Sequence, residues 1–297
     1  AMDFLCGFWF DKKSDIDEET GVLPFLLDTE TPNEPSEFNI KFFVDDKRYW
    51  YTLVLNDKQV IKENLYVYNS VQPSLVFSRE LDGTASLIKL NASLVKANAT
   101  IVEQLNVKCL SNMSFFAARN QVNCSLAYID EVRDWMKNNM MPIIEPGTRM
   151  FEYAGKQMEK NAELKAYILD FVHKADYNIT DVYTEREKVP IPDFVKTSIM
   201  EDKDIPEKTK EKMLADNAIE RLRTDFQHTV KNKRGEENYR LPNSLQSEGT
   251  KRTFGIEAAI YEAIKTNGIL PIDEIESSLH PELVEFIIEK FLLPKPT

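Results

Sequence analysis

The stretch Gly268-Ile269-Leu270-Pro271-Ile272-Asp273-Glu274 decides the fold that we expect, because its apolar run delivers two adjacent carboxylates to its end. An apolar run of this kind predicts a buried strand. Two carboxylates at the edge of a sheet can share the work of phosphate chemistry, since one serves Mg²⁺ and the other an attacking water. The stretch therefore indicates an α/β domain with a nucleotide-hydrolysing site.

A second motif, Ser247-Glu248-Gly249-Thr250, lies upstream and precedes a helical pattern that runs from Arg252 to Thr266. The free N–H groups at a helix start point at any anion that docks there, and a phosphate is the obvious candidate. The alternative is an ordinary capping turn, and for Asp273-Glu274 it is an acidic helix start stabilised by the macrodipole. Taken together, the two motifs favour a phosphate site over these alternatives.

Composition places the chain among ordinary globular proteins. It has 297 residues, of which 42% are hydrophobic and 29% charged, enough for one large domain or two smaller ones. No apolar stretch is long enough for a membrane span and no signal segment is recognisable, so we expect a cytoplasmic protein. Three cysteines without metal-ligand spacing fit free thiols in a reducing compartment. The net charge of -12 argues against broad binding to nucleic acid and leaves room for a local basic patch.

The pattern changes character along the chain. Between Phe38 and Arg79 four aromatic and β-branched runs are separated by turn-forming pairs, which predicts an antiparallel meander. Apolar residues then recur at helical spacing, so we expect helices over Ser114 to Asn139, Met150 to Lys174 and Pro206 to Asp225. The stretch from Val189 to Lys203 combines prolines with mixed charges and is expected to be a linker or insertion.

The last segment returns to an α/β rhythm. We expect a helix over Arg252 to Thr266, a strand over Gly268 to Ile272 and a helix over Pro281 to Leu292. The expected domains are a β-rich lobe (residues 1–110), a mainly helical lobe or insertion (111–240) and a segment that carries both motifs (241–297).

At this point the sequence resembles the ABC-type ATPases related to the SMC proteins, in particular the bacterial AAA-type ATPases of the abortive-infection and overcoming-lysogenisation-defect kind. In the resemblance, Ser247 to Thr250 is the signature, Ile269 to Glu274 the Walker B strand and Ser277 to Pro281 the D-loop. It extends with lower specificity to Pro24 to Asp28, the meander around Tyr49, Lys174 to Ile179 and Phe226 to His228. It implies an α/β (α+β mixture) fold: a P-loop NTPase-like, ABC-type domain with an antiparallel meander and a helical insertion.

The resemblance also implies roles and partners. Asp273 would hold Mg²⁺ through its water shell, and Glu274 would orient or deprotonate the attacking water. The cofactors would be ATP and Mg²⁺, with ATP sandwiched between two subunits of a homodimer. The residues that the resemblance places at this shared site are Ser247, Glu248, Gly249, Thr250, Ser278 and His280. His280 is also expected to shape the turn before Pro281.

One motif of such proteins has no match in these residues. A phosphate-binding loop requires G-x-x-x-x-G-K-[ST]. The chain has nine glycines, and its one Gly-Lys pair, Gly155-Lys156, is followed by Gln157. We therefore expect the 297 residues to be the central piece of a longer ATPase and to bind ATP weakly or not at all alone. Pro271 is a further departure, because it removes a ladder donor from a central strand.

Three hypotheses follow. In the first, the protein is an ATP-hydrolysing, dimerising switch that controls an effector nuclease or toxin in phage defence or acts in DNA-related processes. In the second, it is a non-catalytic interaction or regulatory module on an ATPase-like scaffold. A less favoured third takes Asp273, Glu274 and Glu276 as a metal-dependent nuclease centre.

Overall fold

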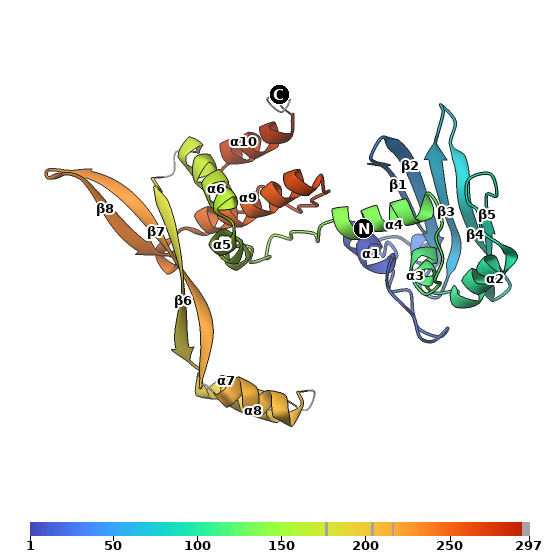
Figure 1. Cartoon of the computed structure of the whole chain (residues 1–297), viewed down its shortest axis with the longest axis horizontal. Coiled ribbons are helices and arrows are strands. Elements are labelled where there is room, and N and C mark those ends of the chain that lie inside the picture. The colour runs from blue at the N-terminus through green and yellow to red at the C-terminus, as the bar shows by residue number, and fades with distance from the viewer. Residues whose placement is uncertain (176–177, 203–204, 216, 293–297) are drawn as a thin grey trace. The chain divides into compact units, whose positions relative to one another are not determined.

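The protein is described by a computed structural model that covers residues 1–175, 178–202, 205–215 and 217–292. The chain forms two compact units (Figure 1). Unit 1 contains Ala1–Ile143 and Asn267–Pro271, and unit 2 contains Ile144–Thr266 and the residues from Ile272 on. The boundary near residue 143 differs from the expected ones at 110 and 240, because the helices between residues 115 and 139 pack on the N-terminal sheet. None of the helices in the described ranges combines the length and apolar character that a membrane span requires.

Unit 1 is built around an antiparallel meander whose five strands follow one another in chain order. The strands are β1 (Ser36–Val44), β2 (Lys47–Leu55), β3 (Val60–Tyr68), β4 (Ser74–Asp82) and β5 (Ala85–Leu90). The meander expected between Phe38 and Arg79 is thus confirmed, and β5 extends it. Alternation explains the core, because Tyr49, Tyr51 and Leu53 of β2 point to one face and are fully buried.

Short helices cover this sheet and meet the core through aromatic side chains. They are α1 (Met2–Phe8), α2 (Ala99–Lys108), α3 (Phe115–Arg119) and α4 (Ile129–Asn139), with a 3₁₀ turn η1 (Thr31–Asn33). The single helix expected over Ser114 to Asn139 is wrong, since the chain leaves the helix after Arg119. The Arg119 guanidinium donates to the carbonyls of Val122 and Cys124, so it stabilises the intervening loop. Phe115 stacks on Phe77 with ring centroids 4.0 Å apart.

A buried ion pair fastens the segment before α3 to the sheet. Arg79 Nη1 of β4 lies 3.2 Å from Glu63 Oε2 of β3, and both side chains are inaccessible to solvent. The same guanidinium donates to Ser86 Oγ and to three carbonyls, those of Leu110, Ser111 and Met113. Glu63 also accepts from the Tyr51 hydroxyl and the Phe115 amide. Burial raises the pKa of Glu63, and the Arg79 charge opposes that rise. Because both groups are well hydrogen-bonded, the pair is structural.

Unit 2 contains most of the remaining helices. They are α5 (Phe151–Lys160), α6 (Ala162–Lys174), α7 (Asp193–Glu201), α8 (Glu207–Ala215), η2 (Asn243–Leu245), α9 (Glu248–Thr266) and α10 (Pro281–Leu292). The expected helix over Met150 to Lys174 is two helices, because Asn161 ends α5 and its side chain caps α6 by accepting from Glu163 N and Leu164 N. The expected helix over Pro281 to Leu292 is confirmed as α10.

Unit 2 also holds a three-stranded antiparallel sheet that the sequence did not predict. Its strands, in order across the sheet, are β6 (Asp181–Pro190), β7 (Ala218–Asn232) and β8 (Gly235–Pro242). The helix expected over Pro206 to Asp225 is therefore wrong beyond α8. The linker expected over Val189 to Lys203 contains the end of β6 and all of α7. Its last residue, Lys203, lies outside the described residues. The region expected to be mainly helical (111–240) thus includes β6, β7 and most of β8. Of the stretch Lys174 to Ile179, residues 176 and 177 are also outside the described ranges.

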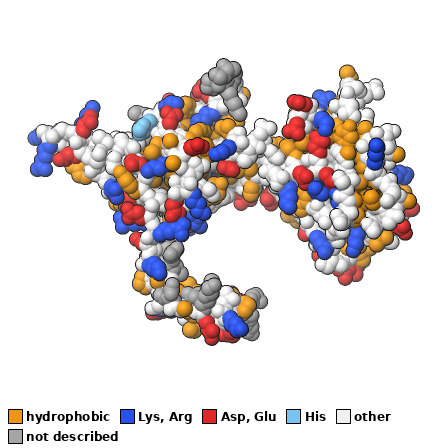
Figure 2. Space-filling view, in the orientation of Figure 1, with side chains coloured by type: hydrophobic (Ala, Val, Ile, Leu, Met, Phe, Trp, Pro, Cys, Tyr) orange, Lys and Arg blue, Asp and Glu red, His pale blue; other side chains and the backbone are white. Residues whose placement is uncertain are grey.

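The β7 and β8 strands continue past the end of β6 as a two-stranded ribbon. The last β6 partner of β7 is Gln227, whereas β7 and β8 remain paired as far as Asn232 and Gly235. Lys and Arg side chains gather at the free end of this ribbon (Figure 2).

The strand expected over Gly268 to Ile272 is absent from the described structure. Two isolated parallel bridges stand in its place, Met140 with Ile269 and Ile144 with Ile272. Pro271 lies between the two bridged residues and has no N–H to donate, which is the physical reason for the interruption. The Asp273 amide nevertheless donates to the Ile144 carbonyl at 2.9 Å, so the approach to the two carboxylates is held by backbone pairing.

A second buried charge lies between the helices of unit 2. Glu257 of α9 has no solvent exposure, and its Oε2 lies 2.5 Å from Lys290 Nζ of α10. Lys290 also donates to the Tyr167 hydroxyl of α6 at 3.1 Å and lies 3.8 Å from the centre of the Phe171 ring. The pair therefore joins α10 to the two helices on which it packs.

Candidate functional site

Ser247 begins helix α9. Its Oγ accepts a hydrogen bond from Thr250 N at 3.0 Å and lies 2.8 Å from Thr250 Oγ1. This is the geometry of an N-cap, which satisfies one of the free N–H groups of the first turn. The helix expected from Arg252 onward thus starts earlier, at Glu248. The capping alternative thus describes the local geometry correctly. Whether the helix start could also bind a phosphate depends on the pocket beside it.

Gly249 brings the start of α9 against the turn that follows Glu274. A Cβ atom placed on Gly249 would lie 2.7 Å from the Ser278 carbonyl oxygen, closer than real Cβ contacts come. Glycine is therefore required here for packing, whatever else the residue does. The contact joins the segment that resembles a signature to the segment that resembles a D-loop within one chain.

Asp273 and Glu274 lie at the start of this turn, and both are exposed. The turn is closed by the Ser277 amide, which donates to the Glu274 carbonyl at 2.8 Å. Glu274 has a φ of 46° and Ser278 a φ of 63°. Left-handed backbone at residues other than glycine costs about 1–3 kcal/mol and gathers at functional sites, so the two torsions support a functional turn.

Arg252 connects this turn to the loop before α5. Its Nη1 donates to the Pro146 carbonyl at 2.8 Å and its Nη2 to the Glu274 carbonyl at 3.4 Å. One guanidinium thus touches α9, the loop and the residue that the resemblance makes the catalytic base.

His280 stands apart from this group. Its ring is exposed, with the nearest carboxylate, that of Glu282, 3.9 Å away. The His280 carbonyl accepts from Leu283 N and Val284 N, so the residue starts helix α10. Its placement thus fits a role in the turn before Pro281 and shows no polar contact with Ser247 or Thr250.

A pocket of about 570 Å³ opens beside the start of α9. We call it the α9 pocket. It is lined by residues 146–152 and by Asn243, Glu248, Lys251, Arg252 and Ser278. Two of the expected site residues, Glu248 and Ser278, therefore meet in one cavity, and Ser247 and Gly249 adjoin it. Asp273, Glu274 and His280 do not line it.

Sequence reasoning missed the three cations of this pocket, Arg149, Lys251 and Arg252. Arg149 comes from a loop about a hundred residues earlier, so no local pattern could reveal it. Lys251 and Arg252 did carry a signal, because two cations in the first turns of a helix oppose its macrodipole. Lys251 is compensated by an ion pair with Glu248. Residues that contradict a local preference, as these cations contradict the helix dipole, are typical of functional sites.

The donor set suits a nucleotide better than an isolated metal ion. The lining holds three cations and two carboxylates, Glu152 and Glu248, so it keeps a positive excess beside a helix start, which complements phosphate charge. In the described ranges, no three His, Cys, Asp or Glu side chains come together to hold a metal ion. Mg²⁺ often takes one or two carboxylates and completes its shell with water and substrate phosphates, so Asp273 fits a metal that arrives with a nucleotide. A nuclease centre at Asp273, Glu274 and Glu276 finds no support in this geometry.

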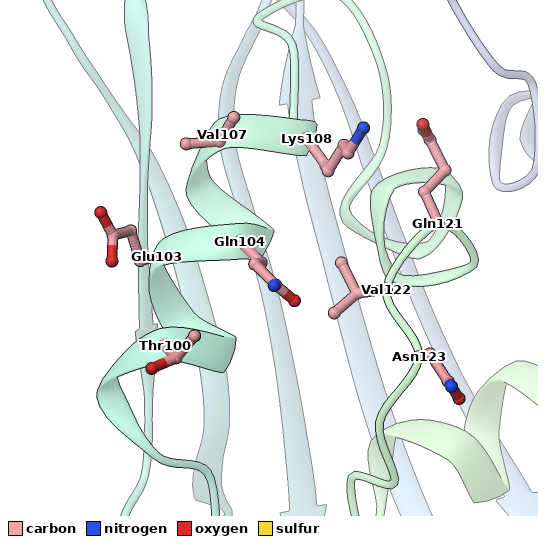
Figure 3. A pocket seen from close by; sticks show the side chains of 8 residues that line it. All are labelled: Thr100, Glu103, Gln104, Val107, Lys108, Gln121, Val122 and Asn123. Atoms are coloured by element: carbon pink, nitrogen blue, oxygen red, sulfur yellow. The ribbon is translucent and has the colours of Figure 1, made fainter.

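A second hollow, of about 420 Å³, lies in unit 1 between α2 and the segment from Gln121 to Asn123 (Figure 3). Gln104 points toward that segment, whereas Glu103 points away from it. The lining is of mixed polarity, with Lys108 as its single cation. None of the expected site residues lies here, so the α9 pocket is the better candidate.

Comparison with known families agrees with the coarser part of this picture. Residues 152–296 match the family model described as "AAA domain, putative AbiEii toxin, Type IV TA system", which supports an AAA-type ATPase-like domain in this part of the chain. The matched segment runs from α5 to α10 and includes half of the residues that line the α9 pocket; residues 146–151 precede it. The fold is a mixture of helices and antiparallel sheets, as expected. Comparisons with curated proteins and with solved structures gave no match.

Proposed function

We propose that this protein is an ATP-binding and ATP-hydrolysing ABC/SMC-like ATPase that acts as a homodimer. The α9 pocket of one subunit receives the phosphates of ATP carried by the phosphate-binding loop of the other. The observation that carries the proposal is the meeting of Arg149, Lys251 and Arg252 at the start of α9. Lys251 and Arg252 lie within the segment similar to an AAA domain, and Arg149 lies just before it. Cations in a partly enclosed site stabilise the charge of a transferring phosphoryl group.

The turn after Ile272 supplies the remaining chemistry. Asp273 would hold Mg²⁺, which would arrive with ATP and would neutralise charge on its phosphates. Glu274 orients the attacking water or takes its proton. Arg252 fixes the Glu274 backbone relative to the pocket through its bond to the Glu274 carbonyl. Ser278 lies against Gly249, so the turn packs directly on the start of α9.

The biological setting that we propose is phage defence, with the nucleotide state controlling an effector nuclease or toxin subunit. The support is the matched family, whose description names a putative AbiEii toxin. The cytoplasm is the compartment in which such a switch would work.

The catalytic assignment is tested by Glu274→Gln in a polypeptide that also carries a phosphate-binding loop. We expect the substitution to abolish hydrolysis, to preserve ATP binding and to favour the dimer, because the water loses its base while the phosphate contacts remain. Glu276→Gln is the matched control, since Glu276 is an exposed carboxylate of the same turn. Unchanged turnover in Glu274→Gln would refute the assignment.

The phosphate contact is tested separately with Arg149→Glu. In the polypeptide that also carries a phosphate-binding loop, we expect loss of ATP-dependent dimerisation, measured by light scattering, because the substitution replaces a cation of the pocket with a further carboxylate that repels the incoming phosphates. Lys156→Glu is the control, because Lys156 is exposed on the adjoining helix α5 and does not line the pocket. If both variants dimerise as the unchanged protein does, the pocket is not the phosphate site.

The second candidate is a non-catalytic interaction or regulatory module. It is favoured by one observation, the absence of G-x-x-x-x-G-K-[ST] from these 297 residues. It predicts that the unchanged protein and Glu274→Gln behave alike in nucleotide binding, turnover and dimer formation. Titration of the unchanged protein and of Glu274→Gln with ATP and Mg²⁺ therefore distinguishes the ATPase from the non-catalytic module.

A further inference from the structure

The β7–β8 ribbon ends in two adjacent cations that its turn does not require. Lys233 and Arg234 form the loop between Asn232 and Gly235, the last paired residues. Gly235 supplies the positive φ of 113° that closes the turn, and Asn232 Oδ1 accepts from Arg234 N at 2.7 Å. Neither Lys233 nor Arg234 is among the described residues with positive φ, so closing the turn makes no demand on the nature of their side chains.

The acidic residues near the tip are already engaged. Glu236 forms an ion pair of 3.1 Å with Lys231. Glu237 accepts from the Tyr239 hydroxyl and from the Asn232 amide, both at 2.5 Å, and these bonds lower its pKa. Lys233 and Arg234 are exposed and have no acidic partner within the described ranges. The positive charge at the tip is therefore available to an external anion.

The face of the ribbon beside the tip is polar. The pairing of Thr229 with Asn238 and of Gln227 with Arg240 places these four side chains on one face, together with Lys231 and its cross-strand partner Glu236. Arg240 is held 3.6 Å from the centre of the Tyr183 ring and 3.8 Å from a Glu185 carboxylate oxygen, and Thr229 donates to Asn238 at 2.8 Å. Hydroxyl, amide and guanidinium groups form hydrogen bonds with phosphates and base edges. Such a surface suits nucleic acid and offers little apolar area to a lipid bilayer.

We propose that the free end of the β7–β8 ribbon binds double-stranded DNA, with Lys233 and Arg234 on backbone phosphates and the polar face in the major groove. A two-stranded ribbon fits the width of that groove in B-form DNA, whereas the major groove of an RNA duplex is too narrow. The proposal does not depend on ATP hydrolysis and concerns a different surface from the α9 pocket. It also locates a cationic patch that the net charge of -12 conceals.

The ribbon base adjoins the start of α9. His228 Nε2 of β7 lies 2.8 Å from Gln246 Nε2, and Gln246 directly precedes the capping residue Ser247. DNA bound to the ribbon would therefore contact β7, the strand whose His228 lies beside the residue that precedes the start of α9.

The test is fluorescence anisotropy of a short labelled DNA duplex of mixed sequence, titrated with the 297-residue protein at several low salt concentrations. We expect binding whose logarithmic dependence on salt has a slope of about -2 to -3, one unit for each phosphate contacted. The double variant Lys233→Glu/Arg234→Glu should weaken binding at least tenfold and reduce the slope by about 2. Glu236→Gln should strengthen binding, since it frees Lys231.

The matched control is Lys12→Glu/Lys89→Glu, which changes the net charge by the same amount at exposed positions of unit 1. It should retain most of the affinity, and circular dichroism should show that all variants are folded. The proposal is overturned if the unchanged protein does not bind the duplex, or if the two double variants bind equally. Equal affinity for an RNA duplex, or a preference for anionic vesicles over DNA, would also overturn it.

Discussion

Lys290 Nζ lies 2.5 Å from Glu257 Oε2, and this contact is the charged link between α10 and α9. Burial raises the pKa of Glu257, and the Lys290 charge opposes the rise. Burial likewise lowers the pKa of Lys290, which Glu257 opposes. Each charge thus offsets the free-energy cost of burying the other. The first two predictions follow from this dependence.

Lys290→Ala should lower the free energy of unfolding by about 3 kcal/mol at neutral pH, because it leaves a buried carboxylate without its cation. The double variant Glu257→Gln/Lys290→Met should recover most of the loss, since neither residue is then charged. Urea unfolding followed by circular dichroism measures both. Equal losses in the single and double variants would contradict the ion-pair explanation.

The effect of Lys290→Ala should also depend on pH. Without Lys290, burial raises the folded-state pKa of Glu257 further above its ordinary value of 4.5. The protonated carboxyl is then favoured by folding, so stability is fully present below the ordinary pKa and is lost as pH rises through the folded one. The difference between the variant and the unchanged protein should therefore be smaller near pH 5 than at pH 8. A difference that is the same at both pH values would argue against a buried charge as its cause.

Gly249→Ala should destabilise the protein by about 1–3 kcal/mol, because the new Cβ would lie 2.7 Å from the Ser278 carbonyl and the turn would have to move. Gly147→Ala is the control from the same pocket, where a Cβ meets nothing within 4 Å. Thermal unfolding should separate the two variants. Similar melting temperatures would show that the turn yields easily.

Ser247→Ala should cost about 1 kcal/mol through loss of the N-cap bond to Thr250 N. Ser247→Asp should restore that stability, since a carboxylate also caps a helix and suits its positive end. If Ser247 also contacts phosphate, Ser247→Asp should still impair ATP-dependent dimerisation, because the added charge repels the nucleotide. Recovery of both properties would leave Ser247 with a capping role only.

Arg79→Lys should destabilise unit 1 by about 3 kcal/mol or more, although the charge is kept. Lysine cannot reproduce the forked donors that reach Glu63, Ser86 and the carbonyls of the segment before α3. All three tryptophans, Trp9, Trp50 and Trp135, lie in unit 1, so urea unfolding followed by tryptophan fluorescence reports on it. A loss below 1 kcal/mol would show that charge alone suffices.

The parts of the fold that sequence predicted are those with local causes. Alternating residues around Tyr51 revealed the meander, and helical spacing revealed α9 and α10. The sheet of unit 2 escaped prediction because β7 pairs with β6 across the α7–α8 segment, and its many charged residues imitate a helix surface. The strand expected before Asp273 failed because Pro271 interrupts the ladder.

For the candidate site, the sequence predicted local motifs and not the contacts between distant segments. Ser247, Glu248, Gly249 and Ser278 were named from motifs, and the structure brings them together around the start of α9. Arg149 was missed because the fold, and no local pattern, carries it to the pocket. The roles of Asp273 and Glu274 stay predictions until turnover is measured.

The contacts of Arg79 also have a consequence for how unit 1 folds. Its partners lie on β3, on β5 and in the segment from Leu110 to Met113, which are distant in sequence. None of these partners alone satisfies all the guanidinium donors, so we expect the segment to dock in the same cooperative step that pairs the strands. We therefore expect the amides of Phe115 and of β3 to exchange with deuterium at similar rates, as members of one cooperative folding unit.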